Sequence, residues 1–398
     1  MKNEKFILIL ISTFIGFILG YSTFFLFYYK KFDEKIKEIL VPKEKYEIIL
    51  KYLDVVNHIR PEYANTSELV YSVINPYSSK INILMQGDSW FNQINFPAKD
   101  NAKSYHDVNI IEPTRNDLKS LNFISNWAKK RNIGVINAGT GSYSPSLMSV
   151  QIEVLERDFN IFPNILVSYI DQTDFGDEIC RYSKNKIYEN DKLSRVSSTK
   201  GLDKSAFNYS RMMKLNEINF NYNSKFLKVL NSINFEIFWE IKKFYLINSS
   251  KLKNIFKKKE VKKCTLQQIF SYLKNPTKAE INYFKTSVLE YLNRIKGKTN
   301  IEQIYLVTFP HLDQLKNLFE ENNSKLINIS SIIDEVVKES NNNSPKKIKH
   351  INFSKIINEN KEMFNYDDYL FDKIHLKQSP HKKFISEIIK FFKFKKIH

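Results

Sequence analysis

Glycine, proline and cysteine are scarce in this chain. Its 398 residues include 9 Gly, 11 Pro and 2 Cys. So few glycines and prolines exclude a collagen-like chain and argue against an all-β sandwich rich in glycine turns. Cys180 and Cys264 lie far apart and match no metal-ligand spacing. We expect two unrelated thiols, with a single disulfide as the alternative, and infer no cellular compartment from them.

Acidic residues are too few to balance the basic ones. The chain has 61 Lys and Arg against 43 Asp and Glu, a formal charge of +18. One interpretation is an anionic partner, and the other is a lysine-rich base composition. Arginine is sparse and the lysines are scattered, whereas nucleic-acid sites favour arginine forks and aromatic platforms. We therefore predict no nucleic-acid partner.

The composition otherwise suits a folded protein. Hydrophobic residues make up 42% of the chain and aromatic residues 14%, which provides a core and argues against general disorder. The length fits one large domain with insertions, or two domains.

Charged residues are absent from residues 6–29, "FILILISTFIGFILGYSTFFLFYY". This run is long enough to cross a bilayer as a helix, and no Ala-x-Ala cleavage site follows it. It predicts an uncleaved single-pass membrane anchor. Lys30 and Lys31 follow it closely, so the lysine count favours a cytoplasmic main domain. The function inferred below instead requires an extracytoplasmic one, and we follow the function.

Four apolar runs rich in β-branched residues predict buried strands: "INILMQG" from Ile81, "IGVINAG" from Ile133, "NILVSYID" from Asn164 and "QIYLVTFP" from Gln303. Helical patterns separate the first three, at residues 116–132 and 145–160. This alternation predicts an α/β fold, a three-layer sandwich with a mostly parallel central sheet.

The composition also suggests boundaries along the chain. We predict an anchor (1–31), a helical connector (32–78), the first part of the α/β domain (79–184), a mainly helical basic insertion (185–300) and the second part of the domain (301–398).

Polar and small residues follow each predicted strand, where the active groups of open parallel sheets collect. They are Asp88 and Ser89 after the first strand, Gly141 and Ser142 after the second, Asp171, Gln172, Thr173 and Asp174 after the third, and His311 after the fourth.

Late in the chain, "FDKIH" supplies Asp372 and His375. A serine nucleophile needs a base to take its proton and a third group to orient that base. Ser89, His375 and Asp372 meet that requirement, although a lone serine in a turn is more often a turn or helix-capping residue.

The four segments "GDSW", "NAGTGSYSP", "DQTDFGDE" and "DKIHLKQSPHKKF" together resemble, in order and placement, the four blocks of the SGNH (GDSL-like) hydrolases. The resemblance covers residues 79–180 and 300–398 and implies a flavodoxin-like sheet. It implies that Ser89 is the nucleophile and an oxyanion donor, His375 the general base and Asp372 its partner.

The resemblance also places the remaining oxyanion donors. It puts Ser142, beside Gly141, where the family has a glycine N–H donor. A backbone donor does not demand glycine, so this departure is mild. Thr173 stands where the family has an asparagine, with Gln172 as a substitute. Losing one such donor costs roughly 2.7–4 kcal/mol of barrier.

Several residues have both a functional and a structural interpretation. Candidate substrate contacts are Asp88, Trp90, His106, Asp174 and His311. Asp88 is expected to fix the strand-to-helix turn, and Trp90 with Phe91 either floors a sugar site or packs in the core. His311 is expected to have a loop role and His381 to start a helix. Asp171 and Asp177 are expected in turns and caps rather than at a metal.

The resemblance implies a serine esterase that acts on small acyl esters, O-acetyl groups of a cell-surface carbohydrate in particular. We expect no cofactor and no metal, and as partners the membrane and an acylated glycan. The alternatives are an O-acyltransferase and a non-catalytic, membrane-tethered glycan-binding protein.

Overall fold

The computed structural model describes residues 71–78, 81–102, 118–196, 214–253, 269–270, 272–320, 326–342 and 344–394, with a few more between 12 and 47. For residues 225, 226 and 242–253 it describes the backbone alone. The chain divides into two compact units, residues 1–47 with 200–263 and residues 48–199 with 264–398.

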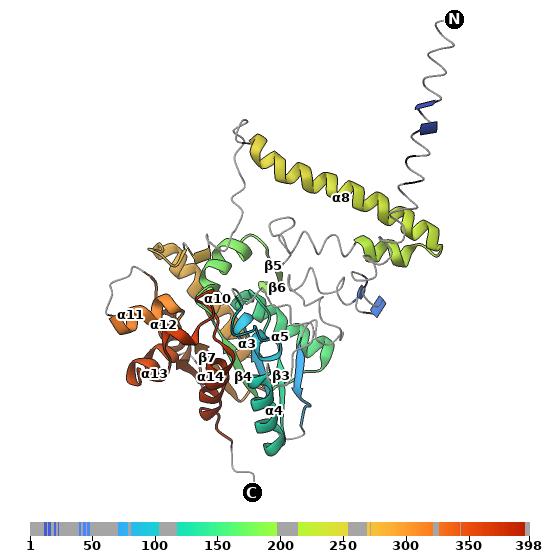
Figure 1. Ribbon diagram of the computed structural model, residues 1–398. Coiled ribbons are helices and arrows are strands. Elements are labelled where there is room, and N and C mark those ends of the chain that lie inside the picture. The colour runs from blue at the N-terminus through green and yellow to red at the C-terminus, as the bar shows by residue number, and fades with distance from the viewer. Residues whose placement is uncertain are drawn as a thin grey trace, which may run out of the picture. The chain divides into compact units, whose positions relative to one another are not determined.

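A six-stranded sheet organises the larger unit (Figure 1). Its spatial order is β1(Ser72–Asn75), β3(Ile133–Asn137), β2(Ile81–Gln86), β4(Ile165–Tyr169), β7(Gln303–Thr308) and β8(Ile348–Asn352). Every pairing is parallel except that of β1 with β3. The five parallel strands follow the flavodoxin-like order, in which the chain reverses direction across the sheet beside the first of them, β2. Polar groups at the ends of β2 and β4 therefore meet at one crevice.

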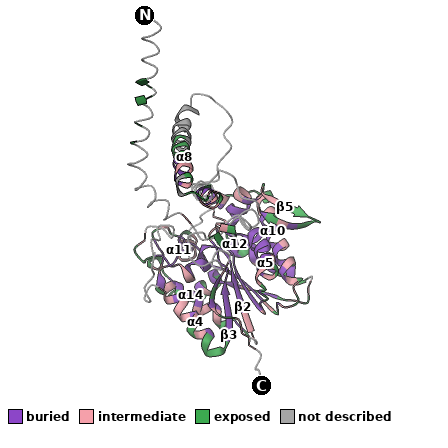
Figure 2. Ribbon diagram, turned by 90° about the vertical axis from the view of Figure 1, so that its right-hand side faces the viewer, coloured by how far each residue is buried: buried purple, intermediate pink, exposed green. Residues whose placement is uncertain are grey.

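Helices cover both faces of the sheet, as Figure 2 shows. On one face α4(Lys119–Arg131) packs against α14(Gln378–Lys390), and on the other α5(Pro145–Phe159) packs against α10(Lys278–Lys296), which also contacts α12(Ile329–Asn342). Successive side chains of β2 point to opposite faces of the sheet. Ile83 and Met85 pack in the core beneath α4 and α14, whereas Gln86 forms hydrogen bonds with α5. The prediction of a mostly parallel α/β sheet is confirmed.

The four predicted strands all form, but two further strands join the sheet. β1 lies within the segment predicted as a helical connector, so that prediction is wrong for Ser72–Asn75. Its burial alternates as an edge strand requires, and four residues are too few to show a period. β8 lies in "IKHINFS", which is too mixed in polarity to indicate a buried strand.

The predicted insertion at 185–300 is not uniformly helical. It begins with a hairpin of β5(Lys186–Glu189) and β6(Lys192–Val196). Asn190 and Asp191 both have positive φ in its two-residue turn, and Asn-Asp between two short strands was an available hairpin signal. α10 belongs to the larger unit, whereas α8(Lys225–Lys253) lies in the smaller one.

The amino-terminal apolar run and the two cysteines lie outside the six strands of the sheet. None of the helices described here is long and apolar enough to cross a bilayer, and most of residues 6–29 falls outside the described residues. Cys180 is disulfide-bonded, so the expectation of two unrelated thiols is wrong. Distance along the sequence does not limit distance in the fold. The bonding partner of Cys180 lies outside the described residues.

Candidate active site

Ser89 begins the short helix α3(Ser89–Asn95) at the end of β2. The Asp88 carboxylate caps this helix by accepting the N–H of Trp90 at 2.9 Å, as predicted for a turn-fixing residue. The first N–H groups of a helix have no intrahelical partner. The N–H of Ser89 therefore points out of the helix start, available to an anionic oxygen.

Ser89, His375 and Asp372 form a continuous hydrogen-bonded chain. Ser89 Oγ lies 2.7 Å from His375 Nε2, and His375 Nδ1 lies 2.8 Å from Asp372 Oδ2. Ser89 is 8% exposed and His375 3% exposed, so the chain is shielded yet reaches the surface at the serine. This geometry allows the histidine to take a proton from the serine while the carboxylate holds the ring.

A tight loop presents Asp372 and His375. Asp372 Oδ1 accepts the N–H groups of Ile374 (2.9 Å) and His375 (3.0 Å). Burial by itself would raise the pKa of Asp372, but the hydrogen bonds and charge of His375 outweigh it and hold that pKa well below its usual range. Asp372 therefore stays ionised and can stabilise an imidazolium.

The second block forms a turn beside the helix start. The N–H groups of Ala138, Gly139, Thr140 and Tyr143 all have acceptors. Within the described part of the chain, the N–H groups of Gly141 and Ser142 have no hydrogen-bond acceptor. Gly141 and Ser142 are the two residues of this block that were predicted to contribute to the oxyanion hole.

Ser142 departs from the expectation in one respect. Its φ is 61°, in the left-handed region that favours glycine. From the sequence we expected that a backbone donor needs no glycine. That expectation missed the positive φ, because the ability of an N–H group to donate does not reveal the backbone conformation. A glycine would adopt this positive φ without strain, whereas Ser142 needs contacts from neighbouring residues to keep the same backbone conformation.

The third block does not offer the donors predicted from the sequence. The hydroxyl and the N–H of Thr173 both donate to Asp171, the N–H at 3.1 Å. The side-chain amide of Gln172 donates to the Phe309 carbonyl at 3.1 Å, and its oxygen accepts the Ile329 N–H at 3.4 Å. In this conformation neither side chain is directed as an oxyanion donor, because buried partners within the fold take their hydrogen bonds.

Asp171 is the centre of a buried polar cluster. It lies 2.6 Å from His311 Nε2 and also accepts the Tyr169 hydroxyl at 3.2 Å. Burial raises the pKa of Asp171, but His311 and Thr173 more than offset this and lower it overall. Burial, together with Asp88 and Asp171, raises the pKa of Asp174, whose carboxylate accepts the Asp171 N–H through one oxygen. The buried surroundings therefore favour the ionised form of Asp171 and disfavour that of Asp174.

The remaining predicted contacts fall into different surroundings. Trp90 is fully buried and stacks on Tyr169, with the ring centroids 5.1 Å apart. Of its two predicted roles, a sugar platform or a core residue, the structure therefore supports the core. His311 is buried against Asp171. His106 lies outside the described residues. Among the described residues no group of three or more His, Cys, Asp or Glu side chains could hold a metal ion.

Two buried groups near the site were missed in the sequence. Glu178 accepts the hydroxyls of Ser144 (2.7 Å) and Ser146 (2.9 Å) and pairs with Lys186 at 2.9 Å. His381 donates from Nε2 to the Trp90 carbonyl at 3.0 Å and accepts at Nδ1 from Ser120. α14 begins at Gln378, three residues before His381, which was expected to start it, and the hydrogen bond of His381 to the residue beside Ser89 had no sequence signal.

His381 should make acid conditions destabilising. Burial lowers its pKa from 6.5 to about 4. The unfolded chain therefore binds the proton first, and stability is lost as pH falls from 6.5 to 4, by about 3 kcal/mol. Asp177, whose pKa burial raises to about 7, acts in the opposite direction over much of this range.

Comparison with His381→Gln isolates the histidine, because Asp177 is common to both proteins. We expect the unfolding free energy of the wild type, minus that of the variant, to fall by about 3 kcal/mol as the pH is lowered from 6.5 to 4. Urea unfolding at a series of pH values measures it. A difference independent of pH would contradict the assignment.

Gly139 allows the second block to approach α3. A Cβ at this position would lie 2.5 Å from Phe91 Cβ and 2.7 Å from the Asn92 backbone nitrogen. We expect Gly139→Ala to lower the free energy of unfolding by ~1–3 kcal/mol through overpacking. Gly141→Ala is the matched control, since nothing lies within 4 Å of its added Cβ. Equal thermal stability of the two variants would refute the close-packing argument.

A second hydroxyl–histidine–carboxylate chain connects the end of β7 to β8 and α12. Thr308 Oγ1 is 2.9 Å from His350 Nε2, and His350 Nδ1 is 2.6 Å from Asp334 Oδ1. Thr308 is fully buried and also bonds to Ser330 at 2.8 Å. It thus has the connectivity of the Ser89 chain without an accessible oxygen, which makes it a useful internal control.

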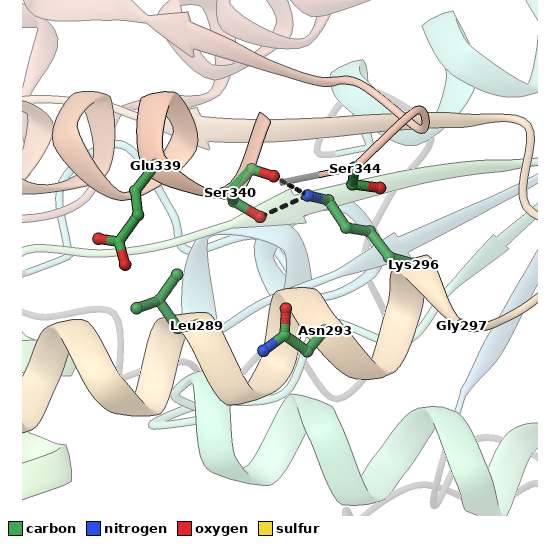
Figure 3. A pocket seen from close by; sticks show the side chains of 7 residues that line it. All are labelled: Leu289, Asn293, Lys296, Gly297, Glu339, Ser340 and Ser344. Carbon is green, nitrogen blue, oxygen red and sulfur yellow. Dashed lines mark hydrogen bonds between the residues drawn. The ribbon is translucent and has the colours of Figure 1, made fainter. Parts of the chain in front are cut away.

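A cavity of about 360 Å³ lies between α10 and α12 and holds none of the predicted site residues (Figure 3). Lys296 Nζ reaches across it to the Ser340 hydroxyl at 2.6 Å. Its lining is Leu289, Asn293, Lys296, Gly297, Glu339, Ser340 and Ser344.

No family model and no curated protein sequence matches this chain. Similar solved structures include a catalytic mutant of Axe2, an acetylxylan esterase from Geobacillus stearothermophilus, at 9% identity and a TM-score of 0.37, covering 81% of this chain and 98% of that one. Another is LAE5, an alpha/beta hydrolase enzyme from the metagenome of Lake Arreo, at 7% identity and a TM-score of 0.36, covering 79% and 95%. At these scores the similarity does not carry a functional argument.

Proposed function

We propose that this protein is a serine esterase of the SGNH type that acts through an acyl-Ser89 intermediate. The observation that carries the proposal is the chain from Ser89 Oγ through His375 to Asp372, with links of 2.7 and 2.8 Å. It starts at a helix N-terminus whose first N–H groups are free of intrahelical partners. The order of the four sequence blocks supports the same assignment.

The reaction follows from these groups. His375 Nε2 takes the Ser89 proton as Oγ attacks the ester carbonyl, and Asp372 stabilises the imidazolium. The N–H groups of Ser89 and Ser142 stabilise the oxyanion. Collapse of the tetrahedral intermediate expels the alcohol, which takes the proton from His375. Water then attacks the acyl-enzyme by the same steps and releases the carboxylic acid.

We propose small acyl groups, O-acetyl in particular, on a cell-surface carbohydrate as the substrate. The excess of lysine supports an anionic glycan. An O-acyltransferase would use the same acyl-Ser89 and differ only in accepting a sugar hydroxyl instead of water.

A non-catalytic glycan-binding protein is the second candidate, and one observation favours it. The Thr173 hydroxyl is bound to Asp171, so the side-chain donor of the third block is missing. The two candidates differ in the reactivity of Ser89.

We further propose a single-pass anchor at residues 6–29 and an extracytoplasmic main domain. The disulfide at Cys180 supports an oxidising compartment, against the lysine count that follows the anchor. α8 leaves Phe238 65% and Ile241 61% exposed, an apolar surface within the unit that includes residues 1–47. Protease protection in both intact cells and spheroplasts would refute this orientation.

Labelling by a serine-directed phosphonate tests the proposed chemistry directly. Wild-type protein should carry one phosphonyl group on Ser89, mapped by peptide mass spectrometry, and should release acetate from an acetylated acidic glycan. Addition of free oligosaccharide distinguishes transfer from hydrolysis by the appearance of an acetylated acceptor. An unlabelled Ser89 in folded protein would leave the binding-protein alternative.

A further inference from the structure

The turn that carries Ser142 has an unfavourable backbone for its sequence. The Tyr143 N–H donates to the Thr140 carbonyl at 3.0 Å and closes the turn. Ser142 is its third residue, with φ 61°. Side chains other than glycine rarely adopt this conformation, so neighbouring groups must hold it.

Two consecutive residues of a π-helix, η4(Asp177–Tyr182), bind Ser142 from both sides of its Cα. Arg181 Nη1 donates to Ser142 Oγ at 2.7 Å, and the Tyr182 hydroxyl donates to the Ser142 carbonyl at 2.6 Å. One contact fixes the side chain and the other fixes the peptide plane that follows. Short π-helical segments occur frequently at functional sites.

The π-helix is itself held in place. Asp177 pairs with Arg181 Nε at 3.2 Å, which orients the guanidinium toward Ser142. Glu178 is fully buried and accepts the Ser144 hydroxyl and the Ser146 N–H, both at 2.7 Å. The segment that follows the turn is therefore tied to the same π-helix that holds the turn.

We infer that Arg181 and Tyr182 are positioning residues that hold the Ser142 N–H in the oxyanion hole. The inference rests on the proposed esterase function and assigns a role to two residues outside the four sequence blocks. It also explains how serine serves at a position whose backbone favours glycine. Arg181 replaces, by a side-chain contact, the conformational freedom that glycine would supply.

The test is a double-mutant comparison of Ser89-dependent hydrolysis of p-nitrophenyl acetate. In the wild-type background, Arg181→Ala should lower kcat by ~10–100-fold with little change in KM. The Ser142 N–H stabilises the transition state and not the bound substrate, so its displacement should slow the chemical step alone. In the Ser142→Gly background the same change should cost less than ~5-fold, since glycine reaches positive φ unaided. Tyr182→Phe should behave like Arg181→Ala.

Arg181→Lys covers the case in which Arg181→Ala does not fold, because it keeps a cation beside Asp177 but loses the planar fork. Arg294→Ala is the matched structural control, since Arg294 bonds to the Ser149 and Leu193 carbonyls without touching the turn. It should shift the melting temperature and leave kcat within about twofold. Equal losses in the Ser142 and Ser142→Gly backgrounds would overturn the inference. A wild-type protein without Ser89-dependent activity would instead overturn the proposed function and, with it, this role.

Discussion

Replacing Ser89 with alanine should lower kcat for p-nitrophenyl acetate by roughly 10³–10⁶-fold. The Ser89 hydroxyl is bonded to His375 Nε2, the atom that takes its proton, so the acyl-enzyme should form on Ser89 Oγ. Removal of Oγ leaves the helix start and its Asp88 cap in place, and the fold should persist. Initial rates of purified wild-type and variant protein measure the effect, with circular dichroism to verify folding.

Thr308→Val is the matched control for this prediction. Thr308 stands in the same relation to His350 and Asp334 as Ser89 does to His375 and Asp372, but it is fully buried. The loss of its hydrogen bonds should lower stability by about 1–3 kcal/mol and leave the rate within twofold. Equal rates for wild type and Ser89→Ala would exclude the esterase.

Asp372→Asn should lower kcat by roughly 10³–10⁴-fold without unfolding the protein. Asp372 Oδ1 accepts two backbone N–H groups, and an asparagine oxygen would keep that position. Its amide nitrogen would then face His375 Nδ1 as a donor. The ring would accept at Nδ1 and carry its proton on Nε2, so it could no longer accept the proton of Ser89.

Steady-state kinetics at neutral pH test this expectation, with thermal unfolding measured alongside. Asp334→Asn makes the corresponding change in the buried chain of Thr308 and His350, and it should alter stability rather than kcat. A kcat for Asp372→Asn within tenfold of wild type would show that His375 does not depend on this carboxylate.

Local sequence was informative where a single property determines the structure. Continuous apolar runs located β2, β3, β4 and β7, because a strand buried on both faces admits few polar residues. The Asp-x-x-His spacing placed Asp372 beside His375 because three residues in one tight turn bring both side chains together. The edge strand β1 was missed because half its residues face solvent or lie partly exposed.

Hydrogen-bond partners were the poorest predictions, and Thr173 and Trp90 show why. The Thr173 hydroxyl can donate to substrate or to the protein, and only the fold reveals that it donates to Asp171. Trp90 is equally suited to a sugar platform and to a core, and the packing of Tyr169 and Phe384 around it decides the matter. Both choices depend on residues distant in the chain.

The amino-acid sequence by itself determined the parallel sheet and which residues follow its strands, because hydrophobic period and chain order are local properties. It also determined that a serine, a histidine and an aspartate are present at the places that the proposed chemistry requires. Only the tertiary structure decided the left-handed backbone of Ser142, its support by Arg181 and Tyr182, and the disulfide at Cys180. These features arise from contacts between segments far apart in the chain, where geometry and competition for partners select one arrangement among many.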